Sequence, residues 1–112
     1  MRLLFDNGTP RGIARELAGL TVKEAREQGW DRMRNGELLD AAEATGFDVL
    51  LTTDKGIRYQ QNLSARKIAI VVLGRARWNL IRPMLPQLVA VVNAVTPGSY
   101  TEVEIPDLMQ SP

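Results

Sequence analysis

Two aspartates in this chain stand directly after short apolar segments, where a carboxylate has no packing role. Asp6 follows "RLLF" and Asp54 follows "VLLTT". If both segments are strands of one parallel sheet, their ends lie at the same edge of that sheet, where ligands of such sheets bind. Glu37 opens an apolar helical pattern that should begin at this edge. Three carboxylates gathered there would raise each other's pKa unless a cation neutralised them.

The residue types that the chain lacks narrow the chemistry. It contains no cysteine and no histidine, which excludes disulfides, thiolate nucleophiles, Ser-His-Asp triads and most transition-metal sites. A bound metal would therefore be held by oxygen atoms, and Mg²⁺ or Mn²⁺ suits such a site. Each acid also has a structural explanation, because Asp6 and Asp54 precede turn-forming residues and a helix dipole favours an acid at the position of Glu37.

Basic residues are concentrated in the segment that follows Asp54. From residue 55 to residue 82 all charged residues are basic: Lys55, Arg58, Arg66, Lys67, Arg75, Arg77 and Arg82. Because the arginine fork matches phosphate geometry, this segment predicts a phosphate-binding surface beside the acids, and a solvated charged face is the alternative. The candidate substrate-binding residues are Lys55, Arg58, Arg75 and Arg77. The candidate supporting residues around the carboxylates are Asn7, Asn35 and Thr53.

The elements that must position these residues alternate between strand and helix patterns. Strands are predicted at residues 2–6, 20–25, 49–53, 67–73 and 100–105, and those at 49–53 and 67–73 have the unbroken apolar runs of strands buried on both faces. Helices are predicted at 10–18, capped by Thr9, at 35–45, capped by Asn35 and ended by Gly46, and within 78–95, where two prolines delay or bend the helix. This alternation predicts the α/β class with a mainly parallel sheet.

Length and hydropathy set the domain organisation. The chain of 112 residues predicts a single domain at residues 1–105 and a flexible C-terminal tail at 106–112. No apolar run approaches the length of a membrane span, and the N-terminus lacks the layout of a signal peptide. We therefore expect a cytoplasmic protein without a membrane partner. The edge strand predicted at 100–105 favours a homodimer.

The order and spacing of the motifs resemble the PIN-like domains, in particular a group of small bacterial PIN-like proteins. The resemblance rests on "LLFDNGTP", "NGELLDAAEATGFDVLLTTD" and "YQQN", and it extends over most of the chain. It implies a three-layer α/β/α sandwich with a parallel central sheet. It also implies an acidic pocket for Mg²⁺ or Mn²⁺ and, in active members, hydrolysis of RNA phosphodiesters. Many relatives are toxins of toxin–antitoxin pairs, akin to VapC-type ribonucleases, so the implied partners are RNA and an antitoxin protein.

The resemblance assigns roles to particular residues. Asp6 matches the first acid of the family and Asp54 the acid after the later strand, while Glu37 is our choice for the acid at the helix start, with Asn35 as the alternative. Asp6, Glu37 and Asp54 are thus the predicted catalytic and metal-binding residues. Typical PIN domains carry a fourth acid, and Gly56 stands at that position here.

Three functional hypotheses follow. The first is a metal-dependent ribonuclease, as the toxin of a toxin–antitoxin pair. The second is a catalytically degenerate PIN-like module that binds RNA or protein without cleaving, and the missing fourth acid supports it. The third is a phosphotransfer domain, either a phosphatase or a receiver-like domain phosphorylated at Asp54. The phosphatase and the receiver-like domain both need a second acid after the first strand, where this chain has Asn7.

Overall fold

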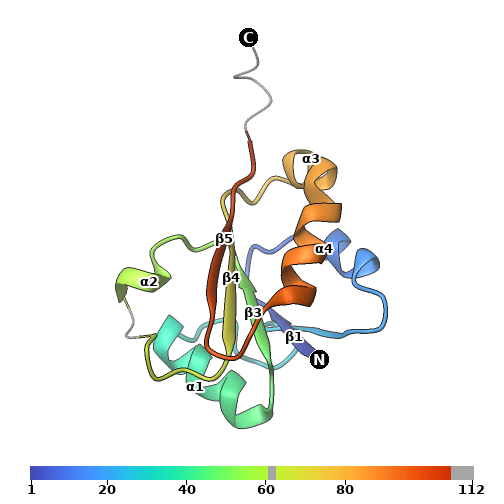
Figure 1. Cartoon of the computed structure of the whole chain (residues 1–112). Coiled ribbons are helices and arrows are strands. Elements are labelled where there is room, and N and C mark those ends of the chain that lie inside the picture. The colour runs from blue at the N-terminus through green and yellow to red at the C-terminus, as the bar shows by residue number, and fades with distance from the viewer. Residues whose placement is uncertain (61–62, 107–112) are drawn as a thin grey trace.

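A parallel five-stranded sheet forms the centre of the chain in its computed structural model, which describes residues 1–60 and 63–106 (Figure 1). The strands are β1 (Arg2–Phe5), β2 (Thr21–Glu24), β3 (Val49–Thr52), β4 (Ala69–Leu73) and β5 (Tyr100–Val103). Their order in the sheet is β2-β1-β3-β4-β5, and every neighbouring pair is parallel. Residues 61–62 of the "YQQN" motif and residues 107–112 of the predicted tail lie outside the described residues.

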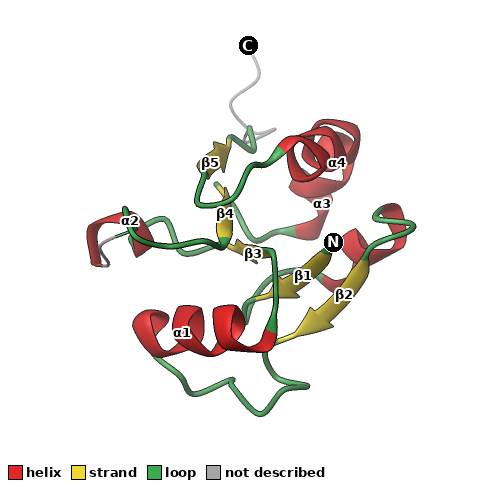
Figure 2. Ribbon diagram, turned by 60° about the horizontal axis from the view of Figure 1, so that its bottom comes forward, coloured by secondary structure: helices red, strands yellow, loops and turns green. Residues whose placement is uncertain are grey.

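Helices cover both faces of the sheet, which confirms the predicted α/β fold with three layers (Figure 2). Helix α1 (Asn35–Thr45) packs Leu38, Leu39 and Ala42 against one face. Helix α4 (Leu85–Ala94) and the 3₁₀ helix η1 (Arg11–Glu16) pack against the other. The apolar residues of β3 and β4 alternate between these two apolar cores, which explains why β4 is apolar throughout and β3 is apolar up to Thr52. None of the helices in the described ranges combines the length and the apolar character needed to cross a membrane.

The helix boundaries differ from the predictions wherever a long-range contact intervenes. The segment expected to be a helix at 10–18 is the shorter η1, and Thr9 does not cap it because the Thr9 hydroxyl donates a hydrogen bond to the Leu51 carbonyl (3.1 Å). Asn35 is the first residue of α1 rather than its cap, which is Arg34. Gly46 ends α1 in the left-handed conformation, as predicted.

The prolines break the C-terminal helical region, as expected from the sequence. It consists of α3 (Trp78–Ile81), the 3₁₀ helix η2 (Arg82–Met84) and α4. The short helix α2 (Ile57–Gln60) lies between β3 and β4. The Trp78 side chain is 38 % exposed, and its ring lies so close to Gly12 that a Cβ there would stand 2.7 Å from a ring atom.

Glu43 joins the last part of α1 to the three residues that precede β4. Its Oε1 atom accepts from Arg66 Nη1 (2.8 Å), and its Oε2 atom accepts from the backbone N–H groups of Lys67 (2.6 Å) and Ile68 (3.2 Å). Burial alone would raise the pKa of the Glu43 carboxyl, but these hydrogen bonds and the Arg66 charge outweigh it, so the pKa lies below its ordinary value of 4.5. The contact stabilises the fold only while Glu43 is ionised.

Two glycines in the left-handed region allow a matched test of the turn before β5. Gly98 has φ +75° and a Cβ there would lie 2.6 Å from the Arg66 carbonyl oxygen, whereas Gly19 has φ +85° and open space. Both alanine variants carry the cost of a left-handed residue, roughly 1–2 kcal/mol. Gly98→Ala should lose about 1–3 kcal/mol more in the free energy of unfolding, because backbone atoms clash. Urea denaturation of both variants measures this, and equal losses would contradict the close approach.

Glu43→Gln should destabilise the protein in a pH-dependent way. The variant loses charge-assisted hydrogen bonds, so we expect about 1–2 kcal/mol less stability at neutral pH. Because the folded-state pKa is depressed, the Glu43 contribution is present above pH 4.5 and is lost as the pH falls through the folded value. The difference between wild type and variant should therefore shrink below pH 4.5. Glu16→Gln, at an exposed position, is the control and should change little at any pH.

Candidate functional site

The two aspartates identified from the sequence emerge side by side at the C-terminal edge of the sheet. Asp6 follows β1 directly, and Asp54 lies two residues beyond the end of β3. These strands are hydrogen-bonded neighbours, with Phe5 aligned to Leu51. The parallel pairing therefore brings both carboxylates to the edge where such sheets bind ligands, and both side chains are half-buried.

Thr52 links the two aspartates. Its hydroxyl donates a hydrogen bond to Asp6 Oδ2 (2.8 Å) and accepts one from the backbone N–H of Asp54 (3.1 Å). The Thr52 side chain is completely buried. A hydroxyl has a single hydrogen, so donation to Asp6 leaves its oxygen to accept from Asp54. This one side chain fixes the position of both acidic residues.

A tight turn holds the other oxygen of Asp6. The Thr9 N–H donates to the Asp6 carbonyl (3.1 Å), and Gly8 adopts φ +85° at the third position of the turn, a conformation that favours glycine. The Asn7 N–H donates to Asp6 Oδ1 (2.8 Å). The Asn7 side chain points elsewhere and donates to the Asp31 carbonyl (2.6 Å), so Asn7 contacts the carboxylate through its backbone.

Asp54 is held by the start of α1 and by its own turn. Asn35 Nδ2 donates to Asp54 Oδ2 (2.7 Å), and the Gly56 N–H donates to Asp54 Oδ1 (2.9 Å). The second bond is that of an ordinary Asx turn. Asn35, our sequence-based alternative to Glu37, is therefore the residue of α1 that contacts an acid of the site.

Glu37 does not gather with the two aspartates. No group of three acidic side chains able to hold a metal ion occurs in residues 1–60 and 63–106. Helix geometry explains this, because residues two apart on a helix do not face each other. With Asn35 directed at Asp54, Glu37 is turned to a different side of α1 and is exposed. The predicted cluster of three carboxylates is not assembled there.

The remaining oxygen donors fit Mg²⁺ or Mn²⁺ only as a sparse site. Each carboxylate oxygen of Asp6 and Asp54 accepts one hydrogen bond described above, and each has a second lone pair. Mg²⁺ is commonly held by one or two carboxylates together with substrate phosphates and water. The donor set thus suits an ion shared with a phosphate substrate, and it does not form an all-protein cage.

The predicted substrate-binding residues have different surroundings. Arg58 forms an ion pair with Glu102 (3.6 Å) and lies over the Tyr100 ring, and Arg75 donates to the Ile105 carbonyl (3.0 Å). Both therefore contact β5 or the segment after it. Lys55 is exposed and lines a pocket of about 310 Å³ with Glu102 and Glu104, and Arg77 is exposed before α3.

Sequence reasoning missed Thr52 and two arginines. It selected Thr53, for which the described residues show no side-chain hydrogen bond. A small pocket of about 90 Å³ beside Asp6 is lined by Arg11 and Arg26, neither of which was chosen from the sequence. A threonine at the end of an apolar strand is a usable signal, because a buried hydroxyl requires a partner. The position of Arg26 depends on the loop after β2, and that of Arg11 on the start of η1, and neither segment has such a signal.

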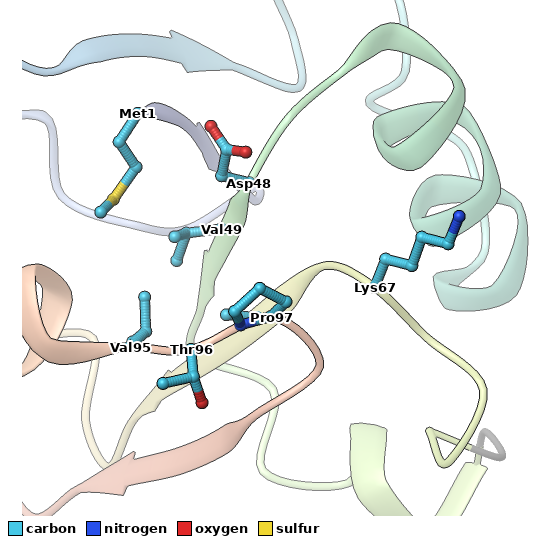
Figure 3. Close-up of a pocket in the computed structure, with 8 residues that line it drawn as sticks. Met1, Asp48, Val49, Lys67, Val95, Thr96 and Pro97 are labelled. Carbon is cyan, nitrogen blue, oxygen red and sulfur yellow. The ribbon is translucent and has the colours of Figure 1, made fainter.

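A different pocket lies at the opposite edge of the sheet and is not a candidate site. It has a volume of about 370 Å³ and is bounded mainly by apolar groups of Met1, Val49, Val95 and Pro97 (Figure 3). Lys67 also borders it, but Figure 3 shows the ammonium group directed away from these residues. Asp48 and Thr96 line it as well, but the Asp48 carboxylate already accepts from the Arg2 N–H (2.7 Å), whereas binding pockets usually combine apolar walls with several converging polar groups.

Comparison with known proteins adds no assignment: neither the protein-family models nor the curated proteins nor the solved structures contain a match to this chain.

Thr52→Val should lower the free energy of unfolding more than Thr53→Val does. The substitution keeps the shape but leaves Asp6 Oδ2 and the Asp54 N–H without this partner, which should cost about 1–3 kcal/mol. Thr53→Val is the matched control and should stay within about 0.5 kcal/mol of wild type. Chemical denaturation gives both values. A Thr52→Val protein as stable as wild type would show that the hydroxyl does not link the two strand ends.

Proposed function

We propose that this chain is a PIN-like, metal-dependent ribonuclease that acts on RNA at Asp6 and Asp54. The observation that carries the proposal is the pair of carboxylates on neighbouring parallel strands, held together by the buried Thr52 hydroxyl. The motifs that resemble PIN-like domains coincide with this pair. The same resemblance supports a role as the toxin of a toxin–antitoxin pair in the cytoplasm, with an antitoxin and a second copy of the chain as protein partners.

Asp6 and Asp54 would hold the Mg²⁺ or Mn²⁺ ion. When bound, such an ion lowers the pKa of a coordinated water and offsets charge on the phosphate. The residues of the chain serve to position the carboxylates. Thr52 fixes Asp6 and the backbone of Asp54, and Asn35 orients the Asp54 carboxylate through its amide. These contacts lie within the fold itself, so the acids would be oriented by the protein rather than by RNA.

A binding module that does not cleave is the second candidate. It is favoured by the absence, in the described part of the chain, of a group of three acids able to hold a metal ion, and by Gly56 at the position of the fourth acid. Such a module would retain the fold and the basic residues and bind RNA through its phosphates. The two candidates differ in one measurable property, which is cleavage.

RNA cleavage with and without metal separates the candidates. A labelled single-stranded RNA should be cleaved by the purified protein with Mg²⁺ or Mn²⁺ and stay intact with a chelator. Asp6→Asn and Asp54→Asn should each reduce the rate by about 100-fold or more, because each removes a charged ligand of the proposed metal ion. Asp40→Asn, on the exposed face of α1, is the matched control and should cleave like wild type.

Three other outcomes would overturn the ribonuclease proposal. Intact RNA in every metal, together with salt-sensitive RNA binding, would establish the binding module instead. Intact RNA without binding would exclude both candidates. Cleavage that survives both Asp→Asn substitutions would place the activity elsewhere, either in the chain or in a contaminating nuclease.

A further inference from the structure

The charges around the two aspartates are distributed unequally along the edge of the sheet. On the β5 side, Glu102 and Glu104 border the pocket that contains Lys55. Arg58 is paired with Glu102, and Arg75 is bound to a backbone carbonyl. A chain of phosphates would therefore meet two carboxylates and partly engaged arginines on that side. The opposite side of the site, toward β2, also carries two glutamates, Glu24 and Glu27, and it differs in having an exposed arginine, Arg26, for which the described residues show no ion pair.

On the β2 side, Asp6 forms part of the wall of the 90 Å³ pocket. The turn at residues 6–9 makes one wall, and Arg11, Glu24 and Arg26 supply the charged groups. Asp6 is thus shared between the two-aspartate site and this pocket. A phosphate bound here would therefore lie beside Asp6, on the β2 side of the two-aspartate site.

The two arginines of this pocket differ in their ion pairing. Arg11 Nε forms an ion pair with Glu24 Oε1 (2.7 Å), while its side chain stays 72 % exposed. A guanidinium has five N–H donors, so this contact orients the group and leaves other donors for an anion. Arg26 is exposed, and no ion pair of Arg26 is found in residues 1–60 and 63–106. It can therefore bind a phosphate without first leaving a partner.

An aromatic ring lies on the same side of the molecule. Trp78 packs against Gly12, the residue that follows Arg11, and is partly exposed. Exposed aromatic rings combined with a basic groove are the usual means of binding single-stranded nucleic acid, because every base can stack on a ring. This combination favours RNA over a small phosphate compound as the ligand.

We propose that the pocket lined by Arg11 and Arg26 is a phosphate subsite for single-stranded RNA, adjacent to the two aspartates. Arg26 is its main phosphate-binding residue, and Arg11, oriented by Glu24, is the second. This inference rests on the proposed function only in taking RNA as the ligand. The RNA strand would then run toward β2. The substrate-binding residues predicted from the sequence lie instead on segments that contact β5.

Equilibrium binding without metal tests the subsite independently of cleavage. A fluorescent single-stranded RNA is titrated with the full chain in the presence of a chelator and at several salt concentrations. Arg26→Gln should raise Kd about 5- to 10-fold and reduce the slope of log affinity against log salt by about 0.7, the value for one lost phosphate contact on a single strand. Arg11→Gln should act in the same direction. Thermal melting confirms that the variants fold.

Two charge-matched variants make the result specific. Lys67→Gln removes one positive charge at the opposite edge of the sheet and should leave the salt slope unchanged. Arg58→Gln removes one positive charge on the β5 side and should raise Kd less than Arg26→Gln does. Wild-type affinity in Arg26→Gln, or a larger loss in Arg58→Gln, would overturn the subsite even if the wild type cleaves RNA. Metal-free binding that depends on Arg26 would support it even if no cleavage occurs, and a wild type that does not bind RNA would refute it.

Discussion

The buried hydroxyl of Thr52 is the contact on which the arrangement of the site depends. Its oxygen accepts a hydrogen bond from the Asp54 backbone N–H, and its hydrogen is donated to the Asp6 carboxylate. A hydroxyl buried without partners would cost the fold free energy, so the requirement to satisfy it favours the same geometry that holds the acids together. Because β1 and β3 are adjacent and parallel, the link is short and needs no movable loop. The position of the two aspartates is thus a property of the sheet itself.

The sequence predicted the parts of the fold that local patterns determine. The apolar runs of β3 and β4, the glycine that ends α1 and the break caused by Pro83 and Pro86 all follow from a few neighbouring residues. The predicted roles of Thr9 and Asn35 as helix caps were wrong. Both residues are good caps in isolation, but the Thr9 hydroxyl binds a carbonyl of β3 and the Asn35 amide binds Asp54. A rule that considers only neighbouring residues cannot include partners that are distant in sequence.

The same limit explains which site residues were found. Asp6 and Asp54 could be placed because each ends an apolar strand, and a parallel sheet brings such ends to one edge. Choosing between Asn35 and Glu37 required the rotational phase of α1, which depends on where the helix starts. Asn35 is the first helical residue, and its side chain contacts Asp54. Glu37 comes two residues later, so its side chain lies on a different side of the helix from Asp54. Arg26 could not be chosen, because its closeness to Asp6 depends on the pairing of β1 with β2 and on the loop that follows.

In the proposed ribonuclease, the two carboxylates and the nearby arginines would couple the binding of metal and RNA. Asp6 and Asp54 provide few ligands, so the affinity for Mg²⁺ alone should be low, and a phosphate oxygen adds the ligand that the protein does not supply. The negative charge of Asp6 in turn repels a phosphate until a cation neutralises it. Each ligand should therefore raise the affinity for the other, and the two increases must be equal because binding is reciprocal. Arg26 lines the same pocket as Asp6, so in this proposal its charge would offset part of that repulsion and would let RNA bind first and bring the ion to the aspartates with it.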